Sequence, residues 1–208
     1  MIRKIHRFGN SLGDASELKA VDTELGKVGI LICGENTNPL ARYSLIAQGE
    51  QIHIATYPPA WPTKRNNTDD DYRLGQNIKI RAATHSFEGK LFTIAVSSLL
   101  DDEAISYISR GNKDIESLLM AVQPPETFVV GPNGRVISEE LIGKEGIVYA
   151  QIDLSKIVEE KQYHDIASES YNRFDIFRFE MDARKHEPVF ISGADDSTIA
   201  KRNGKSKP

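Results

Sequence analysis

Residues 28–33 (VGILIC) narrow the possible folds more than any other part of the chain, because they form a short apolar run rich in β-branched side chains. Such a run is typical of a strand buried on both faces of a parallel sheet. It stops at GENTNP (34–39), where Asn38 can cap a helix and Pro39 can occupy its first turn. We therefore expect a strand, a sharp turn after Cys33, and then a helix.

The rest of the chain alternates short apolar strands with helical segments. Strand patterns lie at 18–23, 51–56, 91–96, 127–131, 146–154 and 174–182, and helical patterns at about 40–48, 72–88, 101–121 and 155–167. The apolar face of the first helix is expected on Leu40, Tyr43, Ile46 and Ala47. Residues 57–71 predict a surface loop, and residues 186–208 a poorly ordered tail. The alternation predicts one α/β domain over residues 1–185.

Composition excludes several classes of protein. The chain has 39% hydrophobic and 27% charged residues, as soluble globular proteins do, and its net charge of −4 offers no basic surface for nucleic acid. No apolar stretch approaches the length of a membrane span, and the N-terminus lacks the apolar core of a secretory signal. The single cysteine excludes an internal disulfide and fits a reducing compartment. We expect a cytoplasmic protein with neither a nucleic-acid nor a membrane partner.

Cys33, at the end of the apolar run, supports two interpretations. The turn can lift its thiol out of the sheet, and backbone N–H groups from Gly34 onward can stabilise a developing negative charge, as at the nucleophile elbow of hydrolases. Alternatively, Cys33 is a small buried apolar side chain, which is the commoner role of a lone cysteine. Spacing alone favours this second interpretation.

Segments along most of the chain resemble the nitrilase branch of the carbon–nitrogen hydrolase superfamily. LICGENTNPLARY (31–43) resembles the cysteine motif of that branch. The similarity continues in order through LIAQGEQIHIATYPPAWP (45–62), IRAATHSFEGKLF (80–92), GPNGRVI (131–137), EGIVYAQIDL (145–154), KQYHD (161–165) and YNRFDIFRF (171–179). The similarity covers about Gly13 to about Phe179. A match of this length is far more specific than one motif, and it favours Cys33 as a nucleophile.

The resemblance implies a four-layer α-β-β-α sandwich that is N-terminally incomplete in this chain. It implies hydrolysis of a small-molecule nitrile to a carboxylic acid and ammonia, through a thioimidate and a thioester on Cys33, with no metal or organic cofactor. Alternatives within the superfamily are an amidase, a carbamoylase or a cyanide-degrading enzyme. An alternative of another class is an inactive truncated remnant that acts only as an assembly module. The resemblance also implies a homo-oligomer, either a dimer or a spiral assembly.

The resemblance assigns roles to two charged residues. Glu35 matches the acidic position of the nitrilase motif and is expected to support the turn or the pocket, with a solvated turn carboxylate as the alternative. Lys4, within Arg3-Lys4-Ile5, is either a displaced form of the family's oxyanion-stabilising lysine or a solvated terminal residue. The family's glutamate base belongs to an N-terminal region that finds no match in this chain.

Four residues are expected at the substrate site: Gly34, Tyr57, Trp61 and His164. Tyr57 and Trp61 follow a strand that should end near the pocket, with a packed loop aromatic as the alternative. His164 matches a His-Asp position near the family's active-site mouth, with a plain surface histidine as the alternative.

Two further histidines are weaker candidates as metal ligands. No metal-like spacing links His53 or His85 to Cys33, so no metal site is expected. His53 lies on an apolar alternating strand, where a histidine is usually a hydrogen-bonded core residue.

Overall fold

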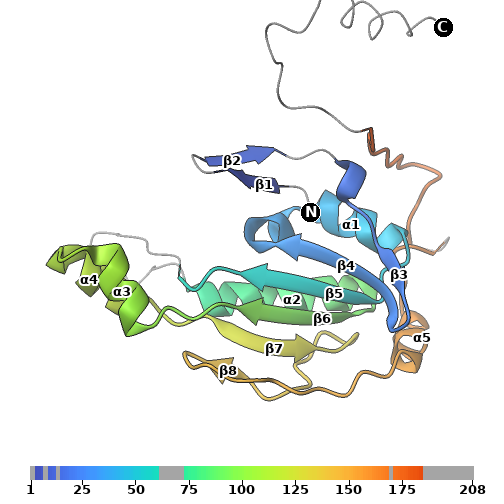
Figure 1. Ribbon diagram of the computed structural model, residues 1–208. Coiled ribbons are helices and arrows are strands. Elements are labelled where there is room, and N and C mark those ends of the chain that lie inside the picture. Colours follow the sequence, from blue (N-terminus) through green and yellow to red (C-terminus); the bar gives the residue numbers. More distant parts are fainter. Residues whose placement is uncertain (1–2, 7–8, 13–14, 61–72, 169–170, 185–208) are drawn as a thin grey trace, which may run out of the picture.

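The computed structural model of the chain describes residues 3–6, 9–12, 15–60, 73–168 and 171–184 (Figure 1). Its strands are β1 (Arg3–His6), β2 (Gly9–Leu12), β3 (Val21–Thr23), β4 (Gly26–Ile32), β5 (Ile52–Tyr57), β6 (Phe92–Ser97), β7 (Glu126–Val130) and β8 (Leu141–Ile142). Its helices are α1 (Pro39–Ala47), α2 (Leu74–Gly89), α3 (Asp102–Ser109), α4 (Lys113–Met120) and α5 (Ser155–Lys161), with short 3₁₀ helices η1 (Ala15–Glu17) and η2 (Cys33–Thr37).

Six strands form one mixed sheet in the order β3-β4-β5-β6-β7-β8, while β1 and β2 pair only with each other. The three central strands, β4, β5 and β6, are parallel, and the outer strands are antiparallel to their neighbours. Parallel neighbours need a crossover connection, which α1 and α2 provide. The carboxyl ends of the three central strands therefore meet at one edge of the sheet, where Ile32, Tyr57 and Ser97 end them.

The expected helix after the turn is confirmed, but its buried face only partly matches the one predicted. Asn38 caps α1 as expected: its side-chain oxygen accepts hydrogen bonds from the N–H groups of Leu40 and Ala41. The buried residues are Ala41, Ser44, Leu45 and Ile46, whereas Leu40 is 63% exposed. Of the four predicted residues, Ile46 is buried and Tyr43 is half-buried, whereas Leu40 and Ala47 are exposed.

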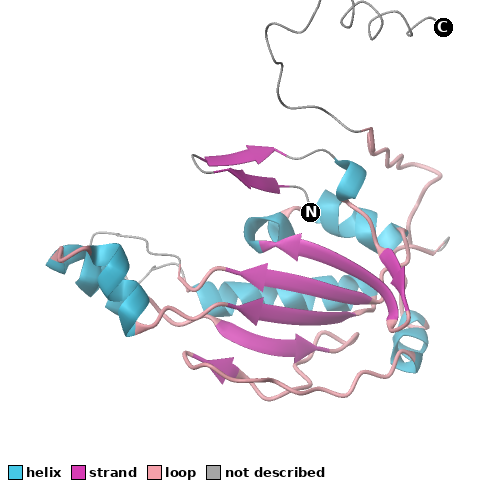
Figure 2. Cartoon of the chain, viewed as in Figure 1, coloured by secondary structure: helices cyan, strands magenta, loops and turns pink. Residues whose placement is uncertain are grey.

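One face of the central sheet is covered by helices. Figure 2 shows α2 lying along β5 and β6, and α1 beside β4. Side chains pointing to this face are almost completely buried, including Leu31 of β4, Ala55 of β5, Ala95 of β6 and Phe128 of β7. They pack against apolar residues of the helices such as Leu45 and Ile78, so the main core lies between these two layers.

The opposite face of the same three strands is also apolar. We call it the open face; it comprises Val28, Ile30, Ile32, Ile54, Ile94 and Val96. The register places Ile30 opposite Ile54 and Ile54 opposite Ile94, which makes a continuous apolar row. Ile30 and Val96 nevertheless remain 41% and 40% exposed. A contiguous exposed apolar patch of this kind marks a surface that another layer can cover, as the second sheet of a four-layer sandwich would.

Two predicted strands are wrong. Residues 146–154 and 174–182 form no regular secondary structure, and Ile147, Tyr149 and Phe177 are largely exposed. Alternating apolar residues predict a strand correctly only where a neighbouring strand can pair with the backbone. Within the described residues no strand pairs with these two segments. Among those same residues, no helix is both long and apolar enough to cross a bilayer.

Candidate active site

Cys33 occupies a strained position at the carboxyl edge of the sheet. It follows β4 directly and has φ = 48°, in the left-handed region that non-glycine residues rarely adopt. For such a residue this conformation costs roughly 1–2 kcal/mol. Cys33 is half-buried and packs against a hydrophobic cluster that includes Tyr57, Ile78 and Phe128. A cysteine held in this way on a strand–turn–helix element has the geometry of a nucleophile elbow.

Two buried polar side chains stabilise the turn. The Glu35 carboxylate accepts a hydrogen bond from the N–H of Ile32 at 2.8 Å, and Glu35 is 5% exposed. The Asn36 amide donates to the carbonyl of Leu31 at 3.0 Å and to that of Cys33 at 3.3 Å. These contacts tie the last residues of β4 to η2. The structure thus places Glu35 where a residue supporting the turn would lie.

Asn36 begins a buried chain of hydrogen bonds that runs beneath the turn; we call it the buried polar chain, and it consists of Asn36, His53, Glu50 and His85. Asn36 Oδ1 lies 2.9 Å from Nε2 of His53, and His53 Nδ1 lies 2.7 Å from Oε1 of Glu50. The other oxygen of Glu50 lies 2.8 Å from Nε2 of His85. All four residues are at most 3% exposed.

A glycine makes room for the Glu50 carboxylate. A Cβ atom on Gly29 would lie 1.9 Å from Oε1 of Glu50, so no larger residue fits at this position unless the carboxylate moves. Gly29 stands opposite His53 in the parallel pair of β4 and β5. The buried polar chain is therefore built into the sheet itself, between β4, β5 and α2.

The buried polar chain has a defined charge distribution. Burial raises the pKa of Glu50, but the hydrogen bonds with His53 and His85 outweigh it and hold that pKa below its ordinary value. Burial lowers the pKa of His85 to about 4, although Glu50 acts in the opposite direction. At neutral pH, Glu50 is accordingly a carboxylate and His85 is a neutral imidazole. The Nδ1 atom of His85 is buried without a hydrogen-bond partner, as an unprotonated ring nitrogen can be.

In the described part of the chain, the side chains close enough together to bind a metal ion are those of Glu50, His53 and His85. Their ligand atoms lie within 4.8 Å of one another. Each oxygen of Glu50, however, is hydrogen bonded directly to a different histidine ring. A metal ion bound there would have to break these hydrogen bonds. We therefore interpret the group as a hydrogen-bond network.

Two of the predicted substrate residues lie close to Cys33. Tyr57, 4% exposed, belongs to the apolar cluster against which Cys33 packs, and the guanidinium of Arg81 lies 5.7 Å from its ring centre. Gly34 is exposed, and a Cβ atom added to it would meet no atom of the described residues within 4 Å. Within this part of the chain, the turn thus has an apolar wall on one side and open space in front of Gly34.

Of the other predicted site residues, His164 is not brought together with Cys33. The ring of His164 packs 4.9 Å from that of Phe87, near the end of α2, which lies at the opposite edge of the sheet. Lys4 lies in β1, where it pairs with Ser11 in the separate hairpin. Trp61 falls outside the described residues.

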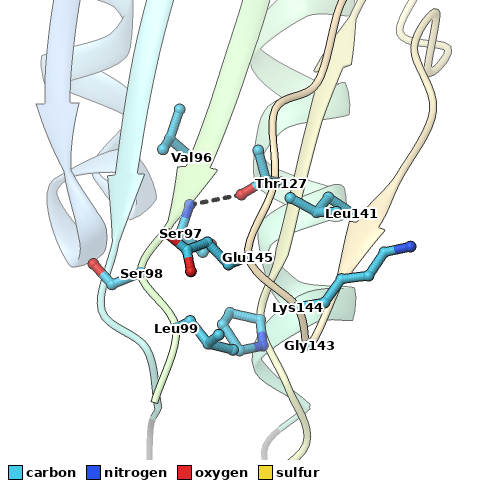
Figure 3. A pocket seen from close by; sticks show the side chains of 11 residues that line it. Val96, Ser97, Ser98, Leu99, Thr127, Leu141, Gly143, Lys144 and Glu145 are labelled. Carbon is cyan, nitrogen blue, oxygen red and sulfur yellow. Dashed lines mark hydrogen bonds between the residues drawn. The ribbon is translucent and has the colours of Figure 1, made fainter. Parts of the chain in front are cut away.

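A small pocket lies at the same edge of the sheet, beyond β6 (Figure 3). Its volume is about 170 Å³, and residues of β6, β7, β8 and the 143–146 loop line it, including Ser97, Thr127, Leu141, Lys144 and Glu145. The N–H of Ser97 donates to the hydroxyl of Thr127 at 3.0 Å. The pocket is smaller than the roughly 300 Å³ or more that drug-sized ligands usually occupy. Since its described lining does not include Cys33, we do not assign it to the cysteine.

Sequence reasoning missed Asn36 and Glu50. Asn36 stands inside the cysteine motif and Glu50 three residues before His53, but both look like ordinary turn residues in the sequence. The available signal was His53 itself, a polar residue on the helix-facing side of an apolar strand, which requires hydrogen-bond partners when buried.

Comparisons with known proteins agree with this geometry. Residues 3–162 match the carbon–nitrogen hydrolase family. The chain is 31% identical over 179 residues to an arylacetone-specific nitrilase of Alcaligenes faecalis, covering 85% of this chain and 48% of that protein. It is 29% identical over 195 residues to an aliphatic nitrilase of Rhodococcus rhodochrous, covering 93% and 49%.

Solved structures give the same fold. The protein Nit3 of Saccharomyces cerevisiae, a member of branch 10 of the nitrilase superfamily, aligns with a TM-score of 0.58 at 19% identity, covering 82% of this chain and 54% of that one. A carbon–nitrogen hydrolase of Helicobacter pylori aligns with a TM-score of 0.56 at 20% identity, covering 79% and 53%. The chain spans about half the length of the relatives it matches. With its sheet, its cysteine turn and most of its length matched in this way, the chain belongs to the carbon–nitrogen hydrolase family.

Proposed function

We propose that the protein is a nitrilase-type hydrolase that converts a nitrile to a carboxylic acid and ammonia, with Cys33 as its nucleophile. The observation that carries this proposal is the strained turn of Cys33 at the carboxyl edge of the sheet. Similar proteins named as nitrilases support the choice of a nitrile as substrate. The single cysteine supports a cytoplasmic location.

The proposed chemistry proceeds in three steps. The Cys33 thiolate attacks the nitrile carbon, and the nitrogen takes up a proton to give a covalent thioimidate. Water then adds to the same carbon, ammonia leaves, and a thioester remains. A second water molecule releases the carboxylic acid and restores the thiol, so that one nitrile and two water molecules give one acid and one ammonia.

The proton transfers in these steps require a positioned acid–base group. The resemblance assigns that role to a glutamate in the N-terminal part of the family's domain. Where the lysine motif matches, the resemblance assigns Lys4 to the stabilisation of the oxyanion. The Glu35 carboxylate is already engaged by the N–H of Ile32. We therefore propose that Glu35 supports the turn, and that substrate contacts come from Gly34, Tyr57 and Trp61.

Paired assays on a nitrile and its matching amide test the substrate class. Production of the acid from the nitrile supports a nitrilase. Turnover of the amide alone would instead assign the protein to the amidases, which share the cysteine nucleophile.

The chain of residues 1–208, purified alone, should show no detectable nitrile turnover and should aggregate. Loss of a positioned acid–base carboxylate typically costs about 10²–10⁴-fold in rate. The open face also leaves Ile30 and Val96 about two-fifths exposed, which favours association between copies. Ammonia release and turbidity measure the two effects. Clear turnover by the purified chain would overturn this prediction and make Glu35 the first candidate for the base.

This outcome also bears on the second candidate function, an inactive assembly module. The exposed apolar residues of the open face favour that alternative. It would be supported if the protein showed no turnover, yet still bound another copy or a related subunit.

The active protein should be a homo-oligomer. We propose that apolar residues of the 40–48 helix and of the FDIFRF segment (174–179) lie at its interfaces. The side chains of Leu40, Phe174 and Phe177 are all more than half exposed. Such exposure is expected of residues that become buried only when copies of the chain associate. Light scattering at micromolar concentration measures the assembly, and a stable monomer would contradict the prediction.

A further inference from the structure

The strained backbone of Cys33 needs a source of support. Continuing β4 in an extended conformation would direct residue 33 to the same side as Leu31, because side chains two apart on a strand share a face. Leu31 is completely buried under the helices. Cys33 instead turns at φ = 48°, which keeps its side chain partly accessible. Groups that hold this turn therefore control whether the thiol can be reached.

The direct support comes from the Asn36 side chain. Its nitrogen lies within hydrogen-bond distance of the Leu31 and Cys33 carbonyls, on either side of the point where the strand ends. Only an NH₂ group can donate to two carbonyl oxygens, so the orientation of the Asn36 amide is determined. The amide oxygen must then face His53.

This orientation determines where the protons lie further along the buried polar chain. Because the Asn36 oxygen can only accept, Nε2 of His53 must donate to it at 2.9 Å. The other ring nitrogen, Nδ1, lies 2.7 Å from the Glu50 carboxylate, and one proton must stand between them. One hydrogen bond therefore joins the His53 ring to Glu50, and Glu50 is anchored on its other side by His85.

We propose that Asn36 and His53, anchored by Glu50, are positioning residues that hold Cys33 in its accessible, left-handed conformation. The inference rests on the proposed role of Cys33 as nucleophile, and it adds the device that presents this nucleophile. None of the three side chains needs to touch substrate. They act through the backbone carbonyl of Cys33, from beneath the turn.

Alkylation of the single cysteine tests the proposal without any nitrile. The protein is treated with iodoacetamide at submicromolar concentration, where association is minimised, and modification of Cys33 is followed by mass spectrometry. Asn36→Ala should slow alkylation about tenfold, because losing the support lets Cys33 leave the left-handed region and turn its thiol toward the core. Glu50→Gln, which keeps the size of the side chain but removes the charge, should slow it by a smaller factor.

Asn38→Ala provides a matched control two residues away. It also removes asparagine hydrogen bonds, those that cap α1, but it leaves the buried polar chain intact. Its alkylation rate should equal that of the wild type, even though its resistance to urea falls. If Asn36→Ala does not fold, Glu50→Gln provides the test.

If Asn36 and Glu50 contributed only to stability, the alkylation results would differ. All three variants would then lose stability, and their folded forms would be alkylated at the wild-type rate, which would overturn the proposal. The alkylation rate is independent of nitrile hydrolysis. A failure of the proposed function would appear instead as an active Cys33→Ala variant.

Discussion

Replacing Cys33 by Ala in the active protein should abolish nitrile turnover and leave the fold intact. Covalent catalysis has no substitute once its nucleophile is removed, and such losses commonly reach roughly 10³-fold or more. The thiol is only half-buried, so its loss should disturb the core little. Product formation from a nitrile measures the effect, and urea unfolding shows whether the variant is folded.

Ser98→Ala is a suitable control for this experiment. Ser98 is exposed at the same edge of the sheet, and the substitution likewise removes one polar atom. It should retain wild-type turnover. Residual activity of Cys33→Ala within about tenfold of the wild type would correspond to a barrier change of only about 1.4 kcal/mol and would reject Cys33 as the nucleophile.

Glu50→Ala should lower the free energy of unfolding by about 2–6 kcal/mol, because two buried histidine rings lose their hydrogen-bond acceptor and each unsatisfied buried group costs about 1–3 kcal/mol. The substitution leaves His53 and His85 facing each other without their shared acceptor, with ring centres 4.2 Å apart. Urea unfolding measures the change. Glu159→Ala is the control, because Glu159 is exposed and pairs only with Lys156 on the surface of α5, so its stability should remain close to that of the wild type.

The same residues should make the protein sensitive to acid. The pKa of His85 is lowered from 6.5 to about 4 in the folded protein, so the unfolded chain binds an extra proton between these two values. Stability therefore falls as the pH drops from about 6.5 toward 4. The pKa of Glu50 is also lowered, and its contribution is present above its ordinary value of 4.5 and is lost as the pH falls through the folded value. The positive charge of Arg42 near His85 also lowers the pKa of His85.

Urea unfolding at several pH values between 7 and 4.5 tests this dependence. His85→Gln should flatten the slope, because glutamine does not titrate. A wild-type protein whose stability is constant over this range would show that His85 does not stay neutral in the folded state. An unchanged unfolding free energy in Glu50→Ala would show that the two hydrogen bonds of Glu50 contribute no net stability.

Much of the fold was determined by local sequence. The apolar run at 28–33, the Asn38-Pro39 helix start and the apolar segments at 51–56 and 91–96 became β4, α1, β5 and β6 within one or two residues. The cap for free N–H groups and the fixed φ at proline act within a few residues. The apolar runs mark the strands that become buried on both faces, although the layers that bury them come from other parts of the chain.

Other features required the tertiary structure. The alternating segments 146–154 and 174–182 satisfy the local pattern of a strand, yet neither pairs with another strand in the described residues. A strand is stabilised by hydrogen bonds to a second strand, and the sequence of one segment does not show whether that partner is available. The buried face of α1 was partly misassigned for a related reason, because the sequence of one helix does not show which of its sides the sheet covers.

The hydrogen bonds that support Cys33 depend entirely on tertiary structure. Sequence motifs singled out the cysteine, but Asn36 meets His53 across 17 positions and Glu50 meets His85 across 35. These partners come together only when β4 and β5 pair and α2 packs on their helix-covered face. Burial then requires these polar residues to hydrogen bond to one another, because a polar group removed from water must find its partner in the same place. The sequence by itself determined the turn at Cys33, and the packing of the sheet decided what holds that turn in place.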